Sequence, residues 1–377
     1  MKLRIAVVAD TLCGWVGGGV VSGRRFVEQL RRNHDVVVIG ADVPGPDCVR
    51  LPGFRLPVRA MHAMQFTMAR PDRAILRDAF SGVDLVHLQF PFWLSHVALE
   101  EARRAGLPVV ASFHVQPENA LWNVGVRSRR LNAMLYRFWV DRLYNRADAV
   151  VCPSHFAERK LRDHGLVAPT VVVSNGVPPD LRRGLRPYAA GAPDPVIVLS
   201  VGRLAAEKRP DVIVKAVLGS RHRHRIKLVF AGAGPLEAEL RRSVRELPIP
   251  AHVGYVERER LEELYGDATL FVHAGEVELE GMAVIEAMAM GVPVVVAQSP
   301  ESAASLLALD RRFAFPGGDS AALTERLDAL LDEPELLREA SVRYVAACRR
   351  LDLGLSLATL AELYASLVER SLRFRPA

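Results

Sequence analysis

The sequence is poor in cysteine and has no long apolar run. Its four cysteines are scattered, with no C-x-x-C pair and no histidine at metal-ligand spacing. Neither a disulfide framework nor a zinc site is therefore expected, and the cysteines indicate reduced thiols in the cytosol. No window approaches the roughly 20 uncharged apolar residues that cross a bilayer. The first residues also lack the features of a signal peptide, so we expect a cytoplasmic protein.

The composition fits a folded protein with more than one domain. Half of the 377 residues are hydrophobic and 24% are charged, which is enough for a packed core. The length suggests about two or three domains. Because 49 basic residues face 43 acidic ones, the net charge is +6. That excess suits an anionic partner, and it fits a nucleic acid, a nucleotide-sugar and a lipid surface equally.

Short β-branched runs alternate with charged, helical segments through both halves of the chain. The runs predict strands at residues 4–9, 35–40, 85–89, 108–114, 149–153 and 170–174, and then at 196–201, 227–231, 252–256, 269–273, 292–297 and 313–315. Such alternation predicts parallel sheets that helices cover on both faces. Each half is therefore expected to form a Rossmann-like domain.

Prolines and glycines gather between the two halves. Residues 178–195 contain five prolines and two glycines, which predicts an interdomain linker. Periodicity predicts helices near the C-terminus, at residues 321–351 and 356–373. The expected parts are an N-terminal domain at 1–180, a linker at 181–195, a second domain at 196–355 and a final helical segment at 356–377.

The most specific motif lies between Thr269 and Ser299. A buried strand leads into a loop with Glu278, and Gly281 then precedes a helix that contains Glu286 and ends at a Gly-x-Pro. In open α/β sheets such a loop and helix N-terminus face the ligand, and the N–H groups there favour an anion. Taken alone, the two glutamates also fit ordinary surface carboxylates.

This motif, E-x7-E followed by A-M-A-x-G-x-P-V-V, resembles glycosyltransferase family 4, whose members are retaining enzymes that use nucleotide-sugars. One position differs, because the family often has an aromatic residue before the glycine and this chain has Glu280. The resemblance implies the GT-B class of α/β fold, with two Rossmann-like domains facing each other across a cleft. It also implies that the last helix crosses back to the N-terminal domain.

A second motif, V-G-R-L-A-A-E-K-R-P, places Arg203 and Lys208 after the first strand of the second domain. When a sugar leaves a nucleoside diphosphate, negative charge develops on the phosphate and a cation must stabilise it. GT-A enzymes use a metal held by D-x-D, and this chain has no D-x-D. The family resemblance gives the task to Arg203 and Lys208, so neither a metal nor a cofactor is expected. The alternative is a surface ion pair of Glu207 with either cation.

The family resemblance also implies the rest of the donor site. Glu286 would bind the ribose hydroxyls and Glu278 the hydroxyls of the donor sugar. The loop G-A-G-P-L resembles a nucleotide-contacting loop of the family, although its glycines also fit a simple turn. The implied backbone contacts are at Gly232, Gly234, Val256, Gly281, Met282 and Ala283.

In the first domain, glycines follow the first predicted strand and a histidine ends the fourth. Gly17, Gly18 and Gly19 permit close backbone approach at a helix N-terminus, and the matching loop of family 4 faces the donor phosphate and the acceptor. Their spacing is not G-x-G-x-x-G, but Asp42 stands about where the ribose-binding acid of a dinucleotide fold would be. A lone histidine is more often simply packed; the resemblance implies that His114 lies near the transferred sugar, without acting as general base.

Three stretches, at residues 51–59, 113–119 and 298–304, look similar to bacterial glycosyltransferases that act on diacylglycerol. Arginines also alternate with aromatic residues and methionines at 50–73 and 121–146. That mixture is typical of elements that lie in a bilayer interface and attract anionic lipids, and also of a surface under another loop or of a phosphate-rich substrate site. Nucleic acid is a weaker candidate, because no nucleic-acid-binding motif accompanies the charge.

We therefore expect a metal-independent, retaining hexosyltransferase that uses UDP-glucose or another UDP-hexose. Its expected acceptor is a membrane lipid such as diacylglycerol, reached by a peripheral protein at the inner face of the cell membrane. One alternative is the same chemistry on a soluble sugar, polysaccharide or metabolite. Two others are a nucleotide-sugar-binding protein without transferase activity and a dinucleotide oxidoreductase.

Overall fold

A computed structural model describes residues 2–13, 17–45, 47–55, 66–179, 181 and 194–373. The chain divides into two compact units. Unit 1 contains Met1–Ser174 and Gly354–Ala377, and unit 2 contains Asn175–Leu353. The chain therefore crosses between the units twice. Nearly all of the predicted linker, 181–195, lies outside the described residues.

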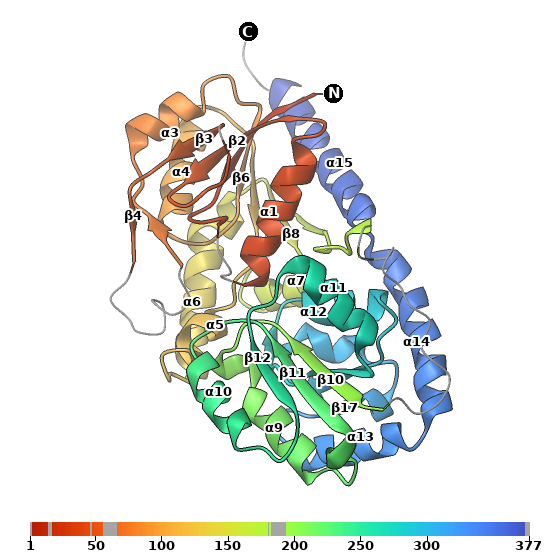
Figure 1. Ribbon diagram of the computed structural model, residues 1–377. Helices are drawn as coiled ribbons and strands as arrows, with labels where there is room; N and C mark the ends of the chain where they lie inside the picture. The colour runs from red at the N-terminus through yellow and green to blue at the C-terminus, as the bar shows by residue number, and fades with distance from the viewer. Residues whose placement is uncertain are drawn as a thin grey trace. The chain divides into compact units, whose positions relative to one another are not determined.

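Unit 1 is built on a seven-stranded parallel sheet (Figure 1). Its strands are β1 (Arg4–Val8), β2 (Asp35–Gly40), β3 (Cys48–Arg50), β6 (Leu85–Leu88), β7 (Val109–Ser112), β8 (Ala149–Cys152) and β9 (Thr170–Val172). They are arranged in the order β3-β2-β1-β6-β7-β8-β9. Strands β6, β7 and β8 are buried at every residue, as expected for a parallel sheet covered on both faces.

The helices of unit 1 follow the strands in βαβ order. They are α1 (Gly18–Leu30), α3 (Arg73–Ala79), α4 (Trp93–Arg104), α5 (Pro117–Trp122), α6 (Arg129–Arg142), η1 (Tyr144–Arg146) and α7 (His155–Arg162). Side chains of Asp72, Ser128 and Ser154 cap α3, α6 and α7 by accepting backbone N–H bonds. A small antiparallel pair, β4 (Gly53–Phe54) with β5 (Met68–Ala69), is not among the predicted strands.

A buried hydrogen-bond network joins the last helix, α15 (Leu353–Arg373), to the sheet of unit 1. The fully buried Tyr364 hydroxyl lies 2.5 Å from His87 Nδ1 on β6, and His87 Nε2 lies 2.7 Å from Ser112 Oγ on β7. Burial lowers the pKa of His87 to about 3, so the ring is neutral at physiological pH.

Unit 2 is built on a six-stranded parallel sheet. Its strands are β10 (Val196–Val201), β11 (Ile226–Ala231), β12 (Ala251–Gly254), β13 (Leu270–His273), β15 (Val294–Gln298) and β17 (Ala314–Pro316). Their order is β12-β11-β10-β13-β15-β17. A two-stranded sheet, β14 (Val277–Glu278) with β16 (Glu301–Ser302), lies beyond the end of β13 in the chain.

The helices of unit 2 pack in pairs, α9 with α13 and α12 with α14. The helical elements are η2 (Ala206–Lys208), α9 (Pro210–Gly219), η3 (Arg223–Arg225), α10 (Glu237–Arg245), α11 (Arg258–Asp267), α12 (Met282–Ala289), η4 (Ala303–Leu307), η5 (Arg311–Phe313), α13 (Ser320–Leu331), α14 (Pro334–Cys348) and η6 (Arg349–Leu351).

The segment predicted to be helical at 321–351 is helical but divided, since α13 ends at Leu331, α14 begins at Pro334 and the short η6 follows α14. Proline has no N–H to bond to the preceding turn, and its fixed φ suits a first helical position. Among the described helices, none combines the length and apolar character that a bilayer crossing requires.

Candidate active site

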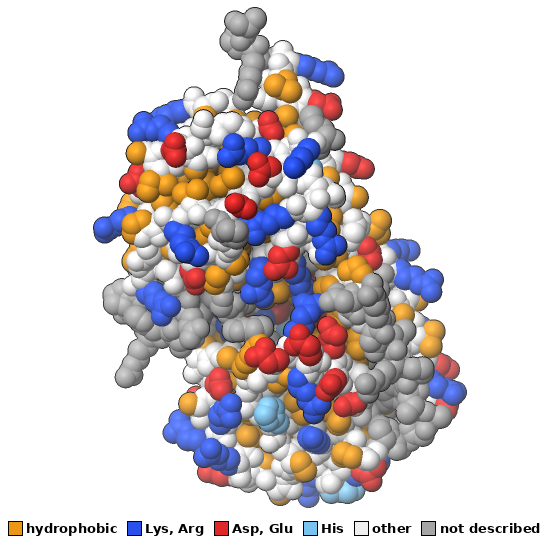
Figure 2. Space-filling view, turned by 45° about the horizontal axis from the view of Figure 1, so that its top comes forward, with side chains coloured by type: hydrophobic (Ala, Val, Ile, Leu, Met, Phe, Trp, Pro, Cys, Tyr) orange, Lys and Arg blue, Asp and Glu red, His pale blue; other side chains and the backbone are white. Residues whose placement is uncertain are grey.

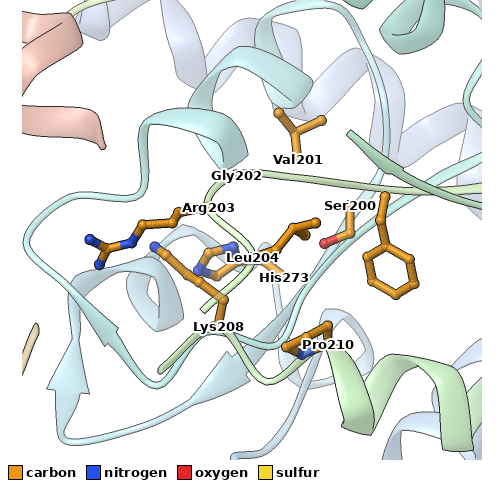
Figure 3. A pocket seen from close by; sticks show the side chains of 9 residues that line it. Ser200, Val201, Gly202, Arg203, Leu204, Lys208, Pro210 and His273 are labelled. Carbon is orange, nitrogen blue, oxygen red and sulfur yellow. The ribbon is translucent and has the colours of Figure 1, made fainter. Parts of the chain in front are cut away.

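The two central strands of the unit 2 sheet end next to each other. Strands β10 and β13 are neighbours, with β11 and β12 on one side and β15 and β17 on the other. In open α/β sheets, ligands bind outside the carboxyl ends of the strands where the strand order reverses. Gly202 and Arg203 follow β10, and His273 ends β13. Together with Lys208 they line a small pocket at this position (Figure 3).

Lys208 and Glu278, both predicted site residues, are in direct contact. Lys208 Nζ forms an ion pair with Glu278 Oε1, although 70 positions separate the two in the chain. His273 Nε2 lies 3.2 Å from the same carboxylate oxygen. Their side chains are largely buried, with exposed fractions of 21% for Lys208, 18% for Glu278 and 5% for His273.

The charge of Lys208 determines the ionisation of Glu278. Burial by itself would raise the pKa of this carboxyl group, but the positive charge of Lys208 and hydrogen bonds to His273 and Lys208 lower it to about 2. Glu278 is therefore a carboxylate throughout the physiological range. In that form it only accepts hydrogen bonds, as an anchor for hydroxyl groups must.

Arg203 forms an ion pair with Glu207. The alternative of an exposed surface pair does not describe this contact, because Glu207 is fully buried and the Arg203 side chain is only 14% exposed. The backbone oxygen of Glu207 also accepts a hydrogen bond from the Glu276 N–H, at 2.9 Å. The pair therefore connects the segment after β10 to the loop that carries Glu278.

That loop, residues 274–281, is held in place by a strand pairing and by a side-chain hydrogen bond. The β14–β16 pairing fixes its middle, and Ser299 Oγ donates a 2.6 Å hydrogen bond to the backbone oxygen of Glu276. Gly281 has a φ of 95°, which side-chain-bearing residues rarely adopt, and it begins α12. Gly281, Met282 and Ala283 thus lie at a helix N-terminus, where orphan N–H groups attract anions. Their role in binding sugar and phosphate stays a prediction.

Glu286 lies one turn further along α12 and is oriented by Tyr265 of α11. The buried Tyr265 hydroxyl lies 3.3 Å from Glu286 Oε2 and 3.4 Å from the backbone oxygen of Ala283. The predicted nucleotide contacts Gly232 and Val256 come from the loops after β11 and β12. These loops leave the same edge of the parallel sheet as β10 and β13.

Gly234 lies in the same loop as Gly232, just before α10. The loop is fixed by backbone hydrogen bonds, from the Gly232 N–H to the Gly254 oxygen at 2.8 Å and from the Leu204 N–H to the Ala233 oxygen at 2.9 Å. The second bond ties the loop to the segment that carries Arg203.

In unit 1, the predicted residues Gly18 and Gly19 begin α1, next to His114. A Cβ atom added to Gly19 would lie 2.9 Å from His114 Cβ and 3.4 Å from Phe90 Cε1, so a larger residue would force these groups apart. Burial lowers the pKa of His114 to about 4. The imidazole is therefore neutral at pH 7 and can either donate or accept a hydrogen bond.

Three residues at or near the unit 2 pocket were not predicted as site residues: His273, Glu276 and Arg209. Arg209 adopts a left-handed φ of 49°, and its guanidinium contacts Glu276 at 2.7 Å and Asp211 at 3.0 Å. Backbone strain of this kind often accompanies functional sites. The position of His273 at a strand end was a usable signal, whereas no local pattern announces the Arg209–Glu276 pair.

Comparison with known proteins identifies the family. Residues 16–181 match the family model Glycosyltransferase Family 4, and residues 188–344 match Glycosyl transferases group 1. A GDP-mannose-dependent alpha-mannosyltransferase of Mycolicibacterium smegmatis is 32% identical over 316 residues, which cover 78% of this chain and 79% of the relative. The chain belongs to glycosyltransferase family 4. The resemblance predicted from the sequence is confirmed, and the dinucleotide oxidoreductase alternative is thereby set aside.

This glycosyltransferase is also similar to a second curated relative and to solved structures. An alpha-monoglucosyldiacylglycerol synthase of Streptococcus pneumoniae is 23% identical over 319 residues, covering 79% of this chain and 72% of the relative. Anabaena HepE, solved with UDP and glucose, has a TM-score of 0.74 at 17% identity, covering 97% of this chain and all of that structure. The structural likeness shows the fold, and the predicted GT-B class is confirmed.

Proposed function

We propose that this glycosyltransferase moves a hexose from a nucleotide-sugar to a membrane lipid, with retention of configuration and without a metal ion. The observation that supports the proposal most is the grouping of Arg203, Lys208 and Glu278 at the carboxyl ends of β10 and β13. Two cations there can stabilise the charge that develops on the departing diphosphate. Arg203 can bind two phosphate oxygens at once, while Lys208 acts as a point charge.

The other predicted residues fit the remaining parts of a nucleotide-sugar. We assign the donor sugar's hydroxyls to Glu278, the ribose hydroxyls to Glu286, and the phosphate to the N–H groups at the start of α12. In the proposed front-face transfer, the bond from the anomeric carbon to the phosphate oxygen breaks as the acceptor oxygen bonds to the same face. The leaving phosphate takes the acceptor's proton. Neutral His114 then serves to position the sugar.

The order in which donors should be tested follows from the relatives. The sequence predicts UDP-glucose or another UDP-hexose, and the diacylglycerol glucosyltransferase relative suits a glucose donor. The relative named for GDP-mannose is more similar, at 32% against 23% identity. We therefore place GDP-mannose first among donors to test and UDP-glucose second.

A lipid acceptor is supported by the surface of α6. Its exposed face mixes Arg130 and Arg137 with Met134 and Phe138, whose exposed fractions are 58% and 50%. Figure 2 shows Lys and Arg side chains interspersed with hydrophobic ones on the face that it displays. Apolar side chains can enter a bilayer interface while arginines attract anionic headgroups. Much of the other arginine-rich segment, residues 56–65, lies outside the described residues.

The decisive experiment incubates the purified protein with a panel of nucleotide-sugars in EDTA, with and without anionic liposomes that contain diacylglycerol. We expect glycolipid only when liposomes are present, and turnover that EDTA does not reduce. Donor hydrolysis without a lipid product would instead indicate a soluble acceptor. Binding of a nucleotide-sugar without hydrolysis or transfer would indicate a binding protein. Loss of turnover in EDTA would contradict the metal-free mechanism.

The α6 surface can be tested separately by vesicle sedimentation. Replacing Met134 and Phe138 by serine should reduce binding to anionic vesicles, whereas Val342→Ser should not. Val342 is a matched control, because it is 68% exposed but lies on α14 of unit 2. Equal sedimentation of both variants and the wild type would refute the assignment of this surface.

A further inference from the structure

Glu280, the residue at which this chain differs from many family members, is buried. Its exposed fraction is 6%, and Glu280 Oε2 accepts two hydrogen bonds from Asn175: one from the backbone N–H at 3.0 Å and one from Nδ2 at 2.6 Å. Asn175 is equally buried. A carboxylate loses hydration when it is buried, and an apolar side chain of similar size avoids that cost. Glutamate at this position is therefore better explained by its acceptor function than by packing.

Asn175 is the first residue of unit 2. Two residues later, the Val177 N–H donates to the Leu351 oxygen at 2.7 Å, and the Leu353 N–H donates to the Val177 oxygen at 3.2 Å. Leu353 is the last residue of unit 2 before the chain returns to unit 1. The segments by which the chain enters and leaves unit 2 are therefore hydrogen-bonded to each other.

Whereas the side chain of Glu280 bonds to Asn175, its backbone directly precedes Gly281, the N-cap of α12. It also lies two residues beyond Glu278, whose strand is held by β16. A continuous path of short contacts thus runs from the 274–281 loop through Glu280 and Asn175 to the Val177 segment. Two hydrogen bonds from Asn175 to the same Glu280 oxygen hold the backbone and the side chain of Asn175 against this loop.

We propose that Glu280 is a positioning residue that couples the donor-binding loop to the two chain crossings between the units. The inference rests on the proposed donor site at Glu278 and Gly281. Ordering of the loop by a nucleotide then orders Asn175–Val177 as well, and rigidity at the crossings in turn keeps the loop in its reactive geometry. Glu280 does not touch the reacting atoms.

The first test is amide hydrogen exchange with and without saturating GDP, and separately UDP. In the wild type, we expect nucleotide to slow exchange at residues 281–283 and also at 175–177. In Glu280→Leu, protection should persist at 281–283 and fall by about tenfold at 175–177, the effect of losing about one strong hydrogen bond. Glu280→Gln keeps an acceptor oxygen and should retain most of the coupling.

The outcomes separate this inference from the proposed function. If neither nucleotide protects 281–283 in the wild type, the proposed donor site itself is wrong. If a nucleotide protects 281–283 but not 175–177, or protects both equally in Glu280→Leu, the coupling is absent and only this inference falls.

Steady-state kinetics give a second readout, with whichever donor the wild type turns over. Glu280→Leu should lower kcat by about tenfold with little change in KM for the donor, and Glu280→Gln should restore most of kcat. Ser220→Ala is the matched control. It removes a buried hydroxyl that bonds Asp328 of α13, in a part of unit 2 that contributes no proposed site residue. If both variants lower thermal stability alike but neither changes kcat, Glu280 is merely structural.

Discussion

Lys208 and Glu278 form an ion pair in which the lysine keeps a largely buried carboxyl group ionised. The relationship is reciprocal, because the carboxylate also holds the ammonium group in the pocket between β10 and β13. Each residue of this pair has a distinct proposed partner in the donor. A change at one position should therefore alter the behaviour of the other.

Replacing Lys208 by methionine should reduce kcat by roughly 100- to 1,000-fold, because a cation beside the leaving phosphate is lost. It should also change the pH profile. With the lysine gone, burial raises the pKa of Glu278, so activity should begin to fall at a higher pH as the solution is acidified. The measurement is kcat/KM from pH 4.5 to 8. Lys215→Met, at an exposed lysine of α9, should match the wild type; an unshifted acidic limb in Lys208→Met would contradict the explanation.

Glu286→Gln should weaken nucleotide-sugar binding by about tenfold to a hundredfold, because the ribose hydroxyls lose a charged acceptor. The value of kcat should change little, in contrast to Lys208 variants. Isothermal titration with the donor and its nucleoside diphosphate measures the effect. Glu263→Gln, at a half-exposed site on α11, is the control. Unchanged affinity in Glu286→Gln would remove this residue from the ribose site.

Arg209→Gly should leave thermal stability nearly unchanged while it slows turnover. Glycine removes the strain of the left-handed backbone, which costs an arginine about 1–3 kcal/mol. Two effects offset this gain in stability: the contact with Glu276 is lost, and glycine increases the conformational entropy of the unfolded chain. The 274–281 loop then loses one of its supports. Arg209→Asn, which tolerates the same backbone without the ion pair, should show the same kinetic defect. Normal turnover in both variants would show that the pair has no part in catalysis.

Asp10 gives unit 1 a specific pH dependence. Burial raises the pKa of its fully buried carboxyl group to about 7, although the Ala69 N–H bonds to Oδ1 at 3.0 Å. Between pH 4 and 7 the native state therefore binds more protons at Asp10 than the unfolded state, so this group lowers stability as the pH rises through that range.

Asp10→Asn removes that dependence, so the stability of the variant relative to the wild type should be higher at pH 8 than at pH 5. Urea unfolding at the two pH values measures the difference. The histidines His87 and His114 contribute the same slope to both proteins and cancel in the comparison. Asp35→Asn, at an exposed position on β2, should show a much smaller pH effect. An Asp10→Asn difference that does not depend on pH would refute the raised pKa.

The strands were predictable because their signal is local. Every predicted run forms a strand of one of the two main sheets, and all of the runs except 313–315 contain β-branched residues; the short β3 was not predicted. The break between α13 and α14 was also readable, since Pro334 is itself the signal. The β14–β16 pair was not, because each strand has only two residues and is defined by its partner.

The candidate site was predictable as a set of residue types but not as a set of contacts. The motifs pointed to Lys208 and Glu278, yet nothing in either motif says that the two side chains meet. Tyr265 reaches Glu286 across 21 positions, and Asn175 reaches Glu280 across 105. Contacts of that kind depend on how helices and loops pack on the sheet, so sequence periodicity does not reveal them.

The contact between Tyr364 and His87 spans 277 positions, with all of unit 2 between them in the chain. On the ribosome, β6 therefore emerges long before α15, the helix that covers it. Unit 2 is contiguous and can complete its core first, although its residues are synthesised later than most of unit 1. We therefore expect unit 2 to be able to finish folding before unit 1, the reverse of the usual N-terminal-first order. Until α15 is synthesised, His87 lacks its Tyr364 partner and unit 1 lacks the buried side chains that α15 adds to its core.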